Sequence, residues 1–317
     1  PAKDYIIRAI QNGKHVVTAN KAVISEHGPE IFAEAKKHNV NVGFEGSVAG
    51  GIPIINPLLE QLSIGKIKSI AGILNGTTNF VLTRMSEGID YHSALAIAQE
   101  KGFAESDPSF DVKGLDAAQK ISILASLAFG RWINPSEVYC EGITEITTID
   151  IEYARELGYA VKLLTTARKT KEGEIDIRVH PALISVNHRL SKVNEEMNAI
   201  HILGSPFEEY FNVGKGAGQG PTAFSVYYDI IKIAEMIKSG VLREIKVDKT
   251  HAKIANQDEI MTEGYLRFYL QHVPGALHSV IGVLAKHGWN VKDSLQRGGL
   301  KYELNVDGIK CLPVIIT

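Results

Sequence analysis

Cysteine is scarce in this 317-residue chain, which contains only Cys140 and Cys311. Two distant cysteines provide neither a disulfide framework nor a cluster of metal ligands, so we expect unreactive thiols and a cytoplasmic protein. The longest apolar runs, such as residues 121–129, are far shorter than the roughly 20 residues that a membrane span needs. The chain also begins without a secretory signal. Membrane and secreted classes are therefore not expected.

A surplus of charge is also missing, because 34 lysine and arginine residues face 36 aspartate and glutamate residues. A protein that binds nucleic acid needs a basic face to neutralise phosphates. We therefore expect neither a nucleic acid nor a membrane surface as a partner. The eleven histidines lack H-x-x-E-H or H-E-x-x-H spacing, so the sequence gives no support to a zinc or serine-triad hydrolase.

The turn G-x-G-x-x-G, which binds phosphates in dinucleotide folds, occurs nowhere in the chain. Apolar strands at 15–19 and 40–44 nevertheless alternate with helices at 5–11 and 29–38, which is typical of a parallel α/β sheet. The pattern then becomes a mixed α+β arrangement with helices on one face of a sheet. Helices are predicted at 54–62, 79–86, 91–101, 115–129, 224–239 and 274–287, and strands at 67–74, 161–167, 175–180, 199–203, 265–271 and 289–295.

The most informative segment covers residues 98–120 and leads through an acidic loop into a helix. Asp116 and Lys120 are four residues apart in that helix, so they share one face and can touch. Such a pair is most often a solvated ion pair of small energy. Glu105, Asp107 and Asp111 would repel one another on an open surface unless a cation or a donor-rich ligand meets them. The segment therefore predicts a polar substrate cradle.

This segment resembles the signature of homoserine dehydrogenases, A-x3-G-[aromatic or aliphatic]-[small]-E-x-D-P-x2-D-[aliphatic]-x-G-x-D-x3-K, at every fixed position. The resemblance implies reduction of aspartate 4-semialdehyde to homoserine with NAD or NADP, in threonine, methionine and isoleucine biosynthesis. The residue that selects between the two cofactors follows the missing glycine-rich turn. Family members carry that turn upstream of the position of Pro1, so we expect the chain to be a fragment. The competing interpretation is a natural domain that never bound a dinucleotide.

The expected chemistry needs a group that stabilises and protonates the growing charge on the aldehyde oxygen. We expect Lys120 to donate to that oxygen, Asp116 to orient Lys120, and Lys21 to share the proton transfer. Glu105 and Asp111 are expected to hold the substrate ammonium group, a task to which carboxylates are suited.

Residues 16–22 end a predicted strand, where ligands collect in open α/β sheets. A lysine there is ordinarily only a surface residue, but the segment resembles the family's V-x-T-A-N-K-A. This implies that Lys21 lies near the nicotinamide, with Thr18 and Asn20 also at the cofactor. A glycine-rich turn at 215–223 opens a helix, as an ordinary helix entry or an anion site does. It resembles the family's G-A-G-x-x-P-T-A and adds Gly218 to the expected cofactor-binding residues.

Two further loops carry polar groups. Residues 75–79 match the family's N-G-T-x-N, which implies that Gly76 and Thr77 line the substrate pocket. Capping of the next helix by Thr78 or Asn79 is the ordinary interpretation of such a turn, and we expect the loop to serve both roles. Residues 44–53 place one acid beside a flexible backbone, which is usual in a helix-entry loop and also suits a monovalent cation. The resemblance implies a sodium site formed by Glu45 with the backbone of three residues, Val48, Gly50 and Ile52.

The expected fold is α/β plus α+β, in several parts. Residues 1–45 and 205–245 are expected to be the remainder of a Rossmann-type dinucleotide-binding domain with a parallel sheet. Residues 46–204 are expected to form a mixed-sheet domain for substrate binding, catalysis and dimerisation. A connector at 246–263 would lead to a partial ACT-like βαβ end at 264–317. The ACT motif D-x-P-G-x-L begins here with His272 in place of the acidic residue, and the chain ends before a second helix and a last strand. The sequence therefore predicts two roles for this end equally well: binding of an amino-acid effector, or a small dimerising or vestigial domain.

We therefore interpret the sequence as that of a homoserine dehydrogenase, an NAD(P)-dependent oxidoreductase with a small-molecule substrate, expected as a homodimer or homotetramer. The missing glycine-rich turn keeps a second hypothesis open, an amino-acid-binding regulatory subunit that lacks cofactor binding. A third is another oxidoreductase with the same arrangement of lysine and carboxylates.

Overall fold

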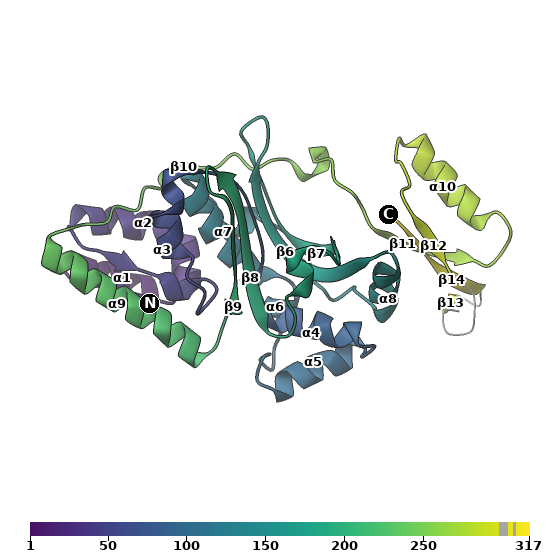
Figure 1. Cartoon of the computed structure of the whole chain (residues 1–317), viewed down its shortest axis with the longest axis horizontal. Coiled ribbons are helices and arrows are strands. Elements are labelled where there is room, and N and C mark those ends of the chain that lie inside the picture. Colours follow the sequence, from purple (N-terminus) through teal and green to yellow (C-terminus); the bar gives the residue numbers. More distant parts are fainter. Residues whose placement is uncertain (298–303, 307–308) are drawn as a thin grey trace.

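The computed structural model describes residues 1–297, 304–306 and 309–317. It shows an elongated molecule with a mixed α/β fold (Figure 1). N-terminal helices lie at one end, a large twisted sheet in the middle and a small α/β unit at the other end. Among the described residues, no helix is both long and apolar enough to cross a membrane.

The N-terminal part contains α1 (Ala2–Gln11), β1 (Val16–Val17), α2 (Lys21–Lys37) and β2 (Val42–Gly43). β1 and β2 pair in parallel through the crossover helix α2. The predicted start of this helix at residue 29 was wrong, because the Asn20 side chain accepts a bond from Val23 N and caps a helix that begins at Lys21. The helix continues through Pro29, since the buried side chains of Ile24 and Ile31 hold it to the core on both sides of the proline.

The chain crosses to the large sheet through η1 (Glu45–Ser47), α3 (Ile55–Leu59) and η2 (Leu62–Ile64), where one continuous helix over 54–62 was predicted. It returns after the sheet to form α9 (Gln219–Ser239), which packs beside η1 and β2. The two crossings touch: Gly51 N donates to Lys215 O at 3.1 Å. A Cβ atom at Gly50 would lie 2.7 Å from the main chain of Gly216, so neither position has room for a side chain.

The central sheet has six strands in the order β5 (Tyr139–Cys140), β7 (Ile175–Ser185), β6 (Tyr159–Lys169), β3 (Lys66–Ile73), β8 (Met197–Ser205) and β9 (Glu208–Lys215). Neighbours are antiparallel except β5 and β7. The periodicity of the sequence did not predict β9. Alternate residues of β8 face opposite sides: Ile200 and Ile202 belong to the main core, whereas Ala199 packs in a smaller cluster on the other face.

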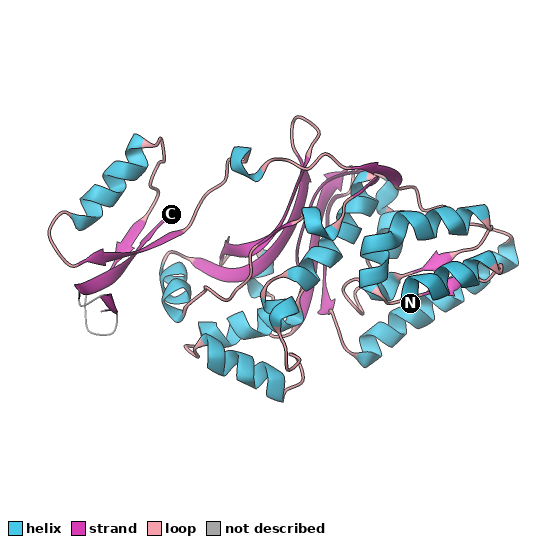
Figure 2. Ribbon diagram, turned by 180° about the vertical axis from the view of Figure 1, so that it is seen from behind, coloured by secondary structure: helices cyan, strands magenta, loops and turns pink. Residues whose placement is uncertain are grey.

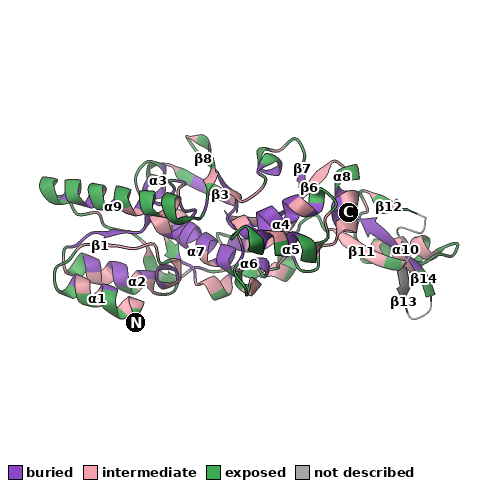
Figure 3. Ribbon diagram, turned by 90° about the horizontal axis from the view of Figure 1, so that it is seen from below, coloured by how far each residue is buried: buried purple, intermediate pink, exposed green. Residues whose placement is uncertain are grey.

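Helices cover one face of this sheet (Figure 2). α4 (Gly76–Ser86) and α7 (Leu115–Phe129) contact its strands, while α5 (Tyr91–Glu100) packs on α4 and α6 (Ser109–Val112) packs on α7. α7 contacts β3, β6 and β7 and is almost entirely buried, whereas α9 is largely exposed (Figure 3). The predicted limits of α7 are confirmed, and the helix is bounded by Gly114 and Gly130, which adopt φ values of 83° and 71°. α7 is therefore a rigid support for the side chains of its first turns.

Short elements complete the middle of the molecule: β4 (Arg131–Trp132), η3 (Pro135–Glu137), α8 (Thr148–Glu156), η4 (Arg189–Lys192), β10 (Asp248–His251) and η5 (Gln257–Glu259). The C-terminal unit follows with β11 (Leu266–Gln271), α10 (Ala276–Lys286), β12 (Ser294–Gln296), β13 (Leu304–Val306) and β14 (Ile309–Ile316). β14 pairs antiparallel with the other three strands. The strand predicted at 289–295 is shorter than expected. The unit contacts α8, where Tyr265 and Arg267 both donate to the buried Asp150 carboxylate.

Candidate active site

Lys120 and Asp116 form a buried ion pair on α7, as their spacing predicted. Lys120 Nζ lies 2.7 Å from Asp116 Oδ2 and also donates to the main-chain oxygen of Leu74 at 2.7 Å. Lys120 is 8% exposed and Asp116 is 5% exposed, so this is not a solvated surface pair. Asp116 and Lys120 therefore lie in an environment where their charges interact more strongly than in water.

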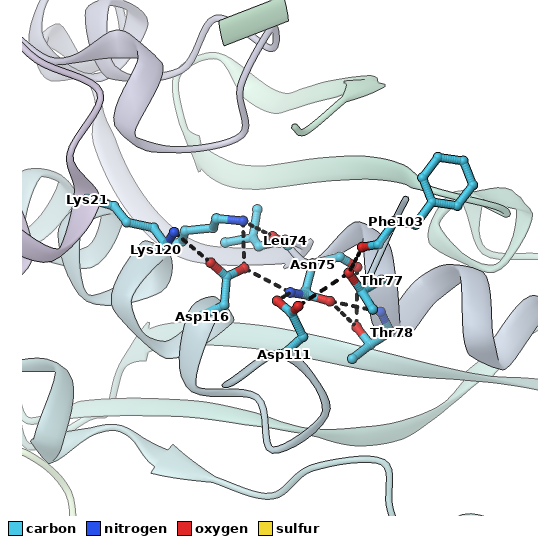
Figure 4. Close-up of polar contacts among 9 residues, drawn as sticks. All are labelled: Lys21, Leu74, Asn75, Thr77, Thr78, Phe103, Asp111, Asp116 and Lys120. Atoms are coloured by element: carbon cyan, nitrogen blue, oxygen red, sulfur yellow. Dashed lines mark hydrogen bonds and ion pairs between the residues drawn. The ribbon is translucent and has the colours of Figure 1, made fainter. Parts of the chain in front are cut away.

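A second lysine reaches the same carboxylate from a different part of the chain. Lys21, the first residue of α2, places Nζ 3.2 Å from Asp116 Oδ1. Burial alone would raise the pKa of the Asp116 carboxyl, but the ammonium groups of Lys120 and Lys21 and their hydrogen bonding bring that pKa below its ordinary value. Asp116 therefore remains a carboxylate that holds two ammonium groups side by side (Figure 4).

Asn75 connects this cluster to a second carboxylate, a role that the sequence did not predict. Its Oδ1 accepts from Thr78 N at 2.8 Å and caps α4, while its Nδ2 donates to Asp111 at 2.7 Å and to Asp116 at 2.9 Å. The expected cap at Thr78 or Asn79 was therefore wrong. Asparagine is among the preferred cap residues, so Asn75 was a visible candidate, but its contacts with the acids arise only from the tertiary fold.

Asp111 is half-buried beside the start of α4. Thr77 Oγ1 lies 3.4 Å from Asp111 Oδ2, so the loop expected to line the substrate pocket does lie against this acid. Burial raises the pKa of the Asp111 carboxyl, the Asn75 amide opposes that rise, and the neighbouring Asp116 charge adds to it. A carboxylate in this position gains stability when a cation approaches.

Glu105 lies apart from this cluster in the described structure. Its side chain is exposed, and it takes no part in the hydrogen bonds and ion pairs that join Asn75, Asp111 and Asp116. Asp107 is also exposed and accepts from Ser109 N at 3.0 Å. The three acids that seemed crowded along the sequence are therefore separated, and of these three Asp111 alone enters the buried cluster.

The residues expected at the cofactor occupy loops that can receive a ligand. Thr18 and Asn20 follow β1, and Asn20 N donates to Thr18 Oγ1 at 3.1 Å just before Lys21. Gly218 precedes α9 with φ 112°, a conformation that favours glycine. These polar groups lie next to Lys21 at the carboxyl end of a parallel strand, where ligands bind in open α/β sheets.

The Glu45 carboxylate does not fit the cation role expected for it. One oxygen accepts from Ile54 N at 2.6 Å and Ile55 N at 2.8 Å, and the other accepts from Asn56 N at 2.7 Å and Asn56 Nδ2 at 2.5 Å. Four N–H donors thus surround it at the start of α3. Within the described ranges, no group of three or more His, Cys, Asp or Glu side chains is arranged to hold a metal ion.

The remaining residues of the expected sodium site are main-chain groups. Val48 and Ile52 are buried, and the Gly50 carbonyl oxygen accepts from Ser225 Oγ at 2.7 Å. Any sodium ion here would depend on these carbonyl oxygens rather than on the Glu45 side chain.

Together, the buried residues can perform proton transfer at an oxygen atom. Two ammonium groups flank one carboxylate, and a half-buried acid lies next to them on the side of Thr77. Such a site can stabilise negative charge on a substrate oxygen while holding a positive group of the same substrate at Asp111.

Comparison with known proteins gives a consistent result over most of the chain. Residues 53–231 match the family described as homoserine dehydrogenase, and residues 1–45 match the homoserine dehydrogenase NAD binding domain. The homoserine dehydrogenase of Neisseria gonorrhoeae is 44% identical over 304 residues, which cover 94% of this chain and 70% of that protein. That of Synechocystis sp. is 43% identical over 308 residues, which cover 94% and 71%.

Solved structures agree with this similarity. The crystal structure of a homoserine dehydrogenase from Thiobacillus denitrificans has a TM-score of 0.90 at 36% identity, covering 100% of this chain and 72% of that one. A hyperthermophilic archaeal homoserine dehydrogenase in complex with NADPH has a TM-score of 0.65 at 34% identity, covering 74% and 68%. The chain belongs to the homoserine dehydrogenase family.

Proposed function

We propose that this protein interconverts L-aspartate 4-semialdehyde and L-homoserine with NAD(P), and that Lys120, Asp116 and Lys21 handle the proton. The observation that carries the assignment is the buried Asp116 carboxylate with one lysine on each oxygen. Relatives above 40% identity support the reaction. The alternative of a regulatory subunit without a cofactor is not favoured, because residues 1–45 match an NAD binding domain.

Lys120 is the residue best placed to donate to the aldehyde oxygen. Its position is fixed by two bonds, to Asp116 and to Leu74 O, so its ammonium group has little freedom to turn away. A preorganised donor of this kind stabilises the charge that grows on the oxygen during reduction. Lys21 is more accessible, with 35% of its side chain exposed, and so can exchange the proton with solvent.

Asp111 is proposed to bind the substrate ammonium group. Its carboxyl is half-buried and lies beside Thr77, so a bound ammonium group would compensate the cost of burying the charge. Glu105 is proposed as a second contact from the exposed loop, and Gly76 completes the pocket at the start of α4.

NAD(P) is proposed to bind along Thr18, Asn20, Lys21 and Gly218. When bound, the nicotinamide supplies the hydride in reduction and accepts it in oxidation. The β1–α2–β2 unit, with its parallel strands, supports a Rossmann-type origin for residues 1–45 and 205–245. A related archaeal enzyme is described in complex with NADPH, which supports the cofactor class.

We also propose that residues 46–204 bind the substrate and form the contact of a homodimer or homotetramer. Residues 246–263 would connect this domain to residues 264–317, a partial ACT-like unit that would bind an amino-acid effector or have a purely structural role. Exposed Leu203 and Val213 on the sheet support a subunit contact. A cytoplasmic location and a sodium ion held by main-chain oxygens belong to the same proposal.

The deciding experiment is Lys120→Ala, assayed for homoserine oxidation and, separately, for cofactor binding by fluorescence. Turnover should be abolished while cofactor affinity stays within about twofold. The matched control is Lys113→Ala, which removes an exposed lysine between α6 and α7 and should leave turnover intact. An unchanged rate in the Lys120 variant would remove this lysine from the mechanism.

A further inference from the structure

Asn198 has a buried side-chain amide without a hydrogen-bond partner among the described residues. The residue is 1% exposed, and neither Oδ1 nor Nδ2 has a partner. Other buried asparagines of the described chain, Asn41, Asn56, Asn75 and Asn79, all form side-chain hydrogen bonds. Since nearly all buried polar groups in proteins are paired, an unpaired amide calls for a specific explanation.

The register of β8 directs this side chain toward the active-site face of the sheet. Asn198 is the second residue of β8 and shares one face of the strand with Ile200 and Ile202, whose side chains belong to the main core together with residues of α7. Asp116 and Lys120 are on α7. The Asn198 amide therefore lies on the face of the sheet that carries the proposed proton-handling residues.

Two glycines mark the surroundings of the amide. A Cβ atom at Gly216 would lie 2.1 Å from Asn198 Cγ and Nδ2, and one at Gly76 would lie 3.6 Å from Asn198 Oδ1. The amide thus lies between the first residue of α4 and the loop that leads from β9 toward α9. These loops carry the proposed substrate and cofactor contacts.

The start of α4 adds further donors at the same place. The first N–H groups of a helix have no carbonyl one turn earlier to bond, and they carry the positive end of the helix dipole. In α4 the Asn75 side chain accepts a hydrogen bond from Thr78 N. The N–H groups of Gly76 and Thr77 belong to the two residues before Thr78 in the same first turn. Thr77 also lies 3.4 Å from Asp111, the proposed site for the substrate ammonium group.

We propose that Asn198 binds the α-carboxylate of the substrate amino acid, together with the N–H groups of Gly76 and Thr77. An α-amino acid carries its carboxylate on the same carbon as its ammonium group, so an ammonium group at Asp111 brings the carboxylate next to the start of α4. Gly76 and Gly216 cover the amide, so the proposed hydrogen bond requires these loops to move when the substrate binds. The inference rests on the proposed function of Asp111 and Lys120.

The test compares Asn198→Ala with Asn79→Ala. Asn79 donates to Val193 O and Met197 O and accepts from Lys162, so its loss should lower the thermal midpoint of the ligand-free protein. Asn198→Ala should lower it less, because packing contacts are lost there but no hydrogen bond is. The same Asn198 variant should raise the KM for homoserine by about 10- to 100-fold, as expected for a hydrogen bond to a charged group, with the KM for the cofactor unchanged.

Two further measurements separate a ligand contact from a structural effect. Asn198→Ser, which retains a small donor, should restore part of the affinity. The inhibition constant of 3-aminopropan-1-ol, which is homoserine without its carboxylate, should be the same in wild type and in both Asn198 variants. Equal losses for the two ligands, or an unchanged KM for homoserine, would overturn the assignment of Asn198. Failure of the proposed function would differ, because the wild-type protein itself would then show no homoserine-dependent turnover.

Discussion

The ammonium group of Lys120 is bonded to the main-chain oxygen of Leu74, at 2.7 Å, across 46 residues of sequence. Leu74 directly follows β3 and directly precedes Asn75, whose side chain contacts Asp111 and Asp116. The lysine and the loop that carries the substrate contacts therefore hold each other in place. A change in either should affect both the geometry of the site and the stability of the carboxyl end of β3, a central strand of the sheet.

Replacing Asn75 should lower kcat/KM strongly and the free energy of unfolding only slightly. In Asn75→Ala, α4 loses its cap, which costs about 1 kcal/mol of unfolding free energy. The two carboxylates lose the donor that orients them, and we expect kcat/KM to fall by about 10- to 100-fold. Because the Asn75 amide lowers the pKa of Asp111, the acid limb of the pH profile should also move to higher pH.

The control for this variant is Asp90→Ala. Asp90 caps α5 through Ser93 N at 3.1 Å, on the surface and outside the cluster. It should cost a similar amount of stability and leave kcat/KM unchanged. If both variants lost activity in proportion to their stability, Asn75 would be a helix cap and nothing more.

Asp116→Asn should destabilise the protein at neutral pH. The change leaves Lys120 buried without its counter-charge, and breaking a buried pair in this way costs about 3 kcal/mol or more. The folded pKa of Asp116 lies below its unfolded value, so the stabilisation is present above about pH 4 and is lost as the pH falls through the folded value. Urea unfolding from pH 7 to pH 3 should therefore show the difference between wild type and variant shrinking below about pH 4. A difference that stays constant over this range would contradict the assignment.

Lys162 should make the protein more stable at alkaline pH. It is buried in the sheet, with Nζ bonded to Asn79 Oδ1 at 3.0 Å and Val193 O at 2.6 Å, and burial lowers its pKa to about 8. Between about pH 8 and its unfolded value near 10.5, the unfolded chain binds the proton more tightly than the folded one, so stability rises with pH by up to about 3 kcal/mol. Denaturant unfolding of wild type and Lys162→Met across this range measures the effect, because the methionine variant should lack this increment.

Glu45→Gln distinguishes a structural carboxylate from a cation ligand. A side-chain NH2 group would face N–H donors that now bind the carboxylate, and we expect a loss of about 2 to 4 kcal/mol in unfolding free energy. Added sodium should not restore it. Wild-type stability combined with lost sodium dependence of turnover would instead show that the carboxylate binds the ion. Glu60→Gln, which changes an exposed acid near the same helix, serves as control.

Local sequence predicted the parts of the site that lie within one helix. The spacing of Asp116 and Lys120 and the limits of α7 are local features, and the structure has both as predicted. Lys21 was placed near this pair only through a resemblance in sequence, because its contact with Asp116 spans two elements far apart in the chain.

Tertiary contacts decided the features that the sequence did not predict. Asn75, Thr78 and Asn79 are all plausible caps, and the choice of Asn75 depends on its position between α7 and Asp111. The Glu45 carboxylate received its partners from the start of α3, which no spacing rule indicates. Asn198 did leave a signal, because it is a polar residue on the apolar side of an otherwise alternating strand.

The contact between Gly50 and Gly216 sets a limit on mutational tolerance. The methyl group of an alanine at position 50 would lie 2.7 Å from the main chain of Gly216. The methyl group of an alanine at position 216 would lie 2.1 Å from the side chain of Asn198. Random mutagenesis with selection for folded protein should therefore recover glycine alone at these two sites, although neither takes part in chemistry. Glycine would be required at both sites only because two segments that are far apart in the sequence pack closely against each other there.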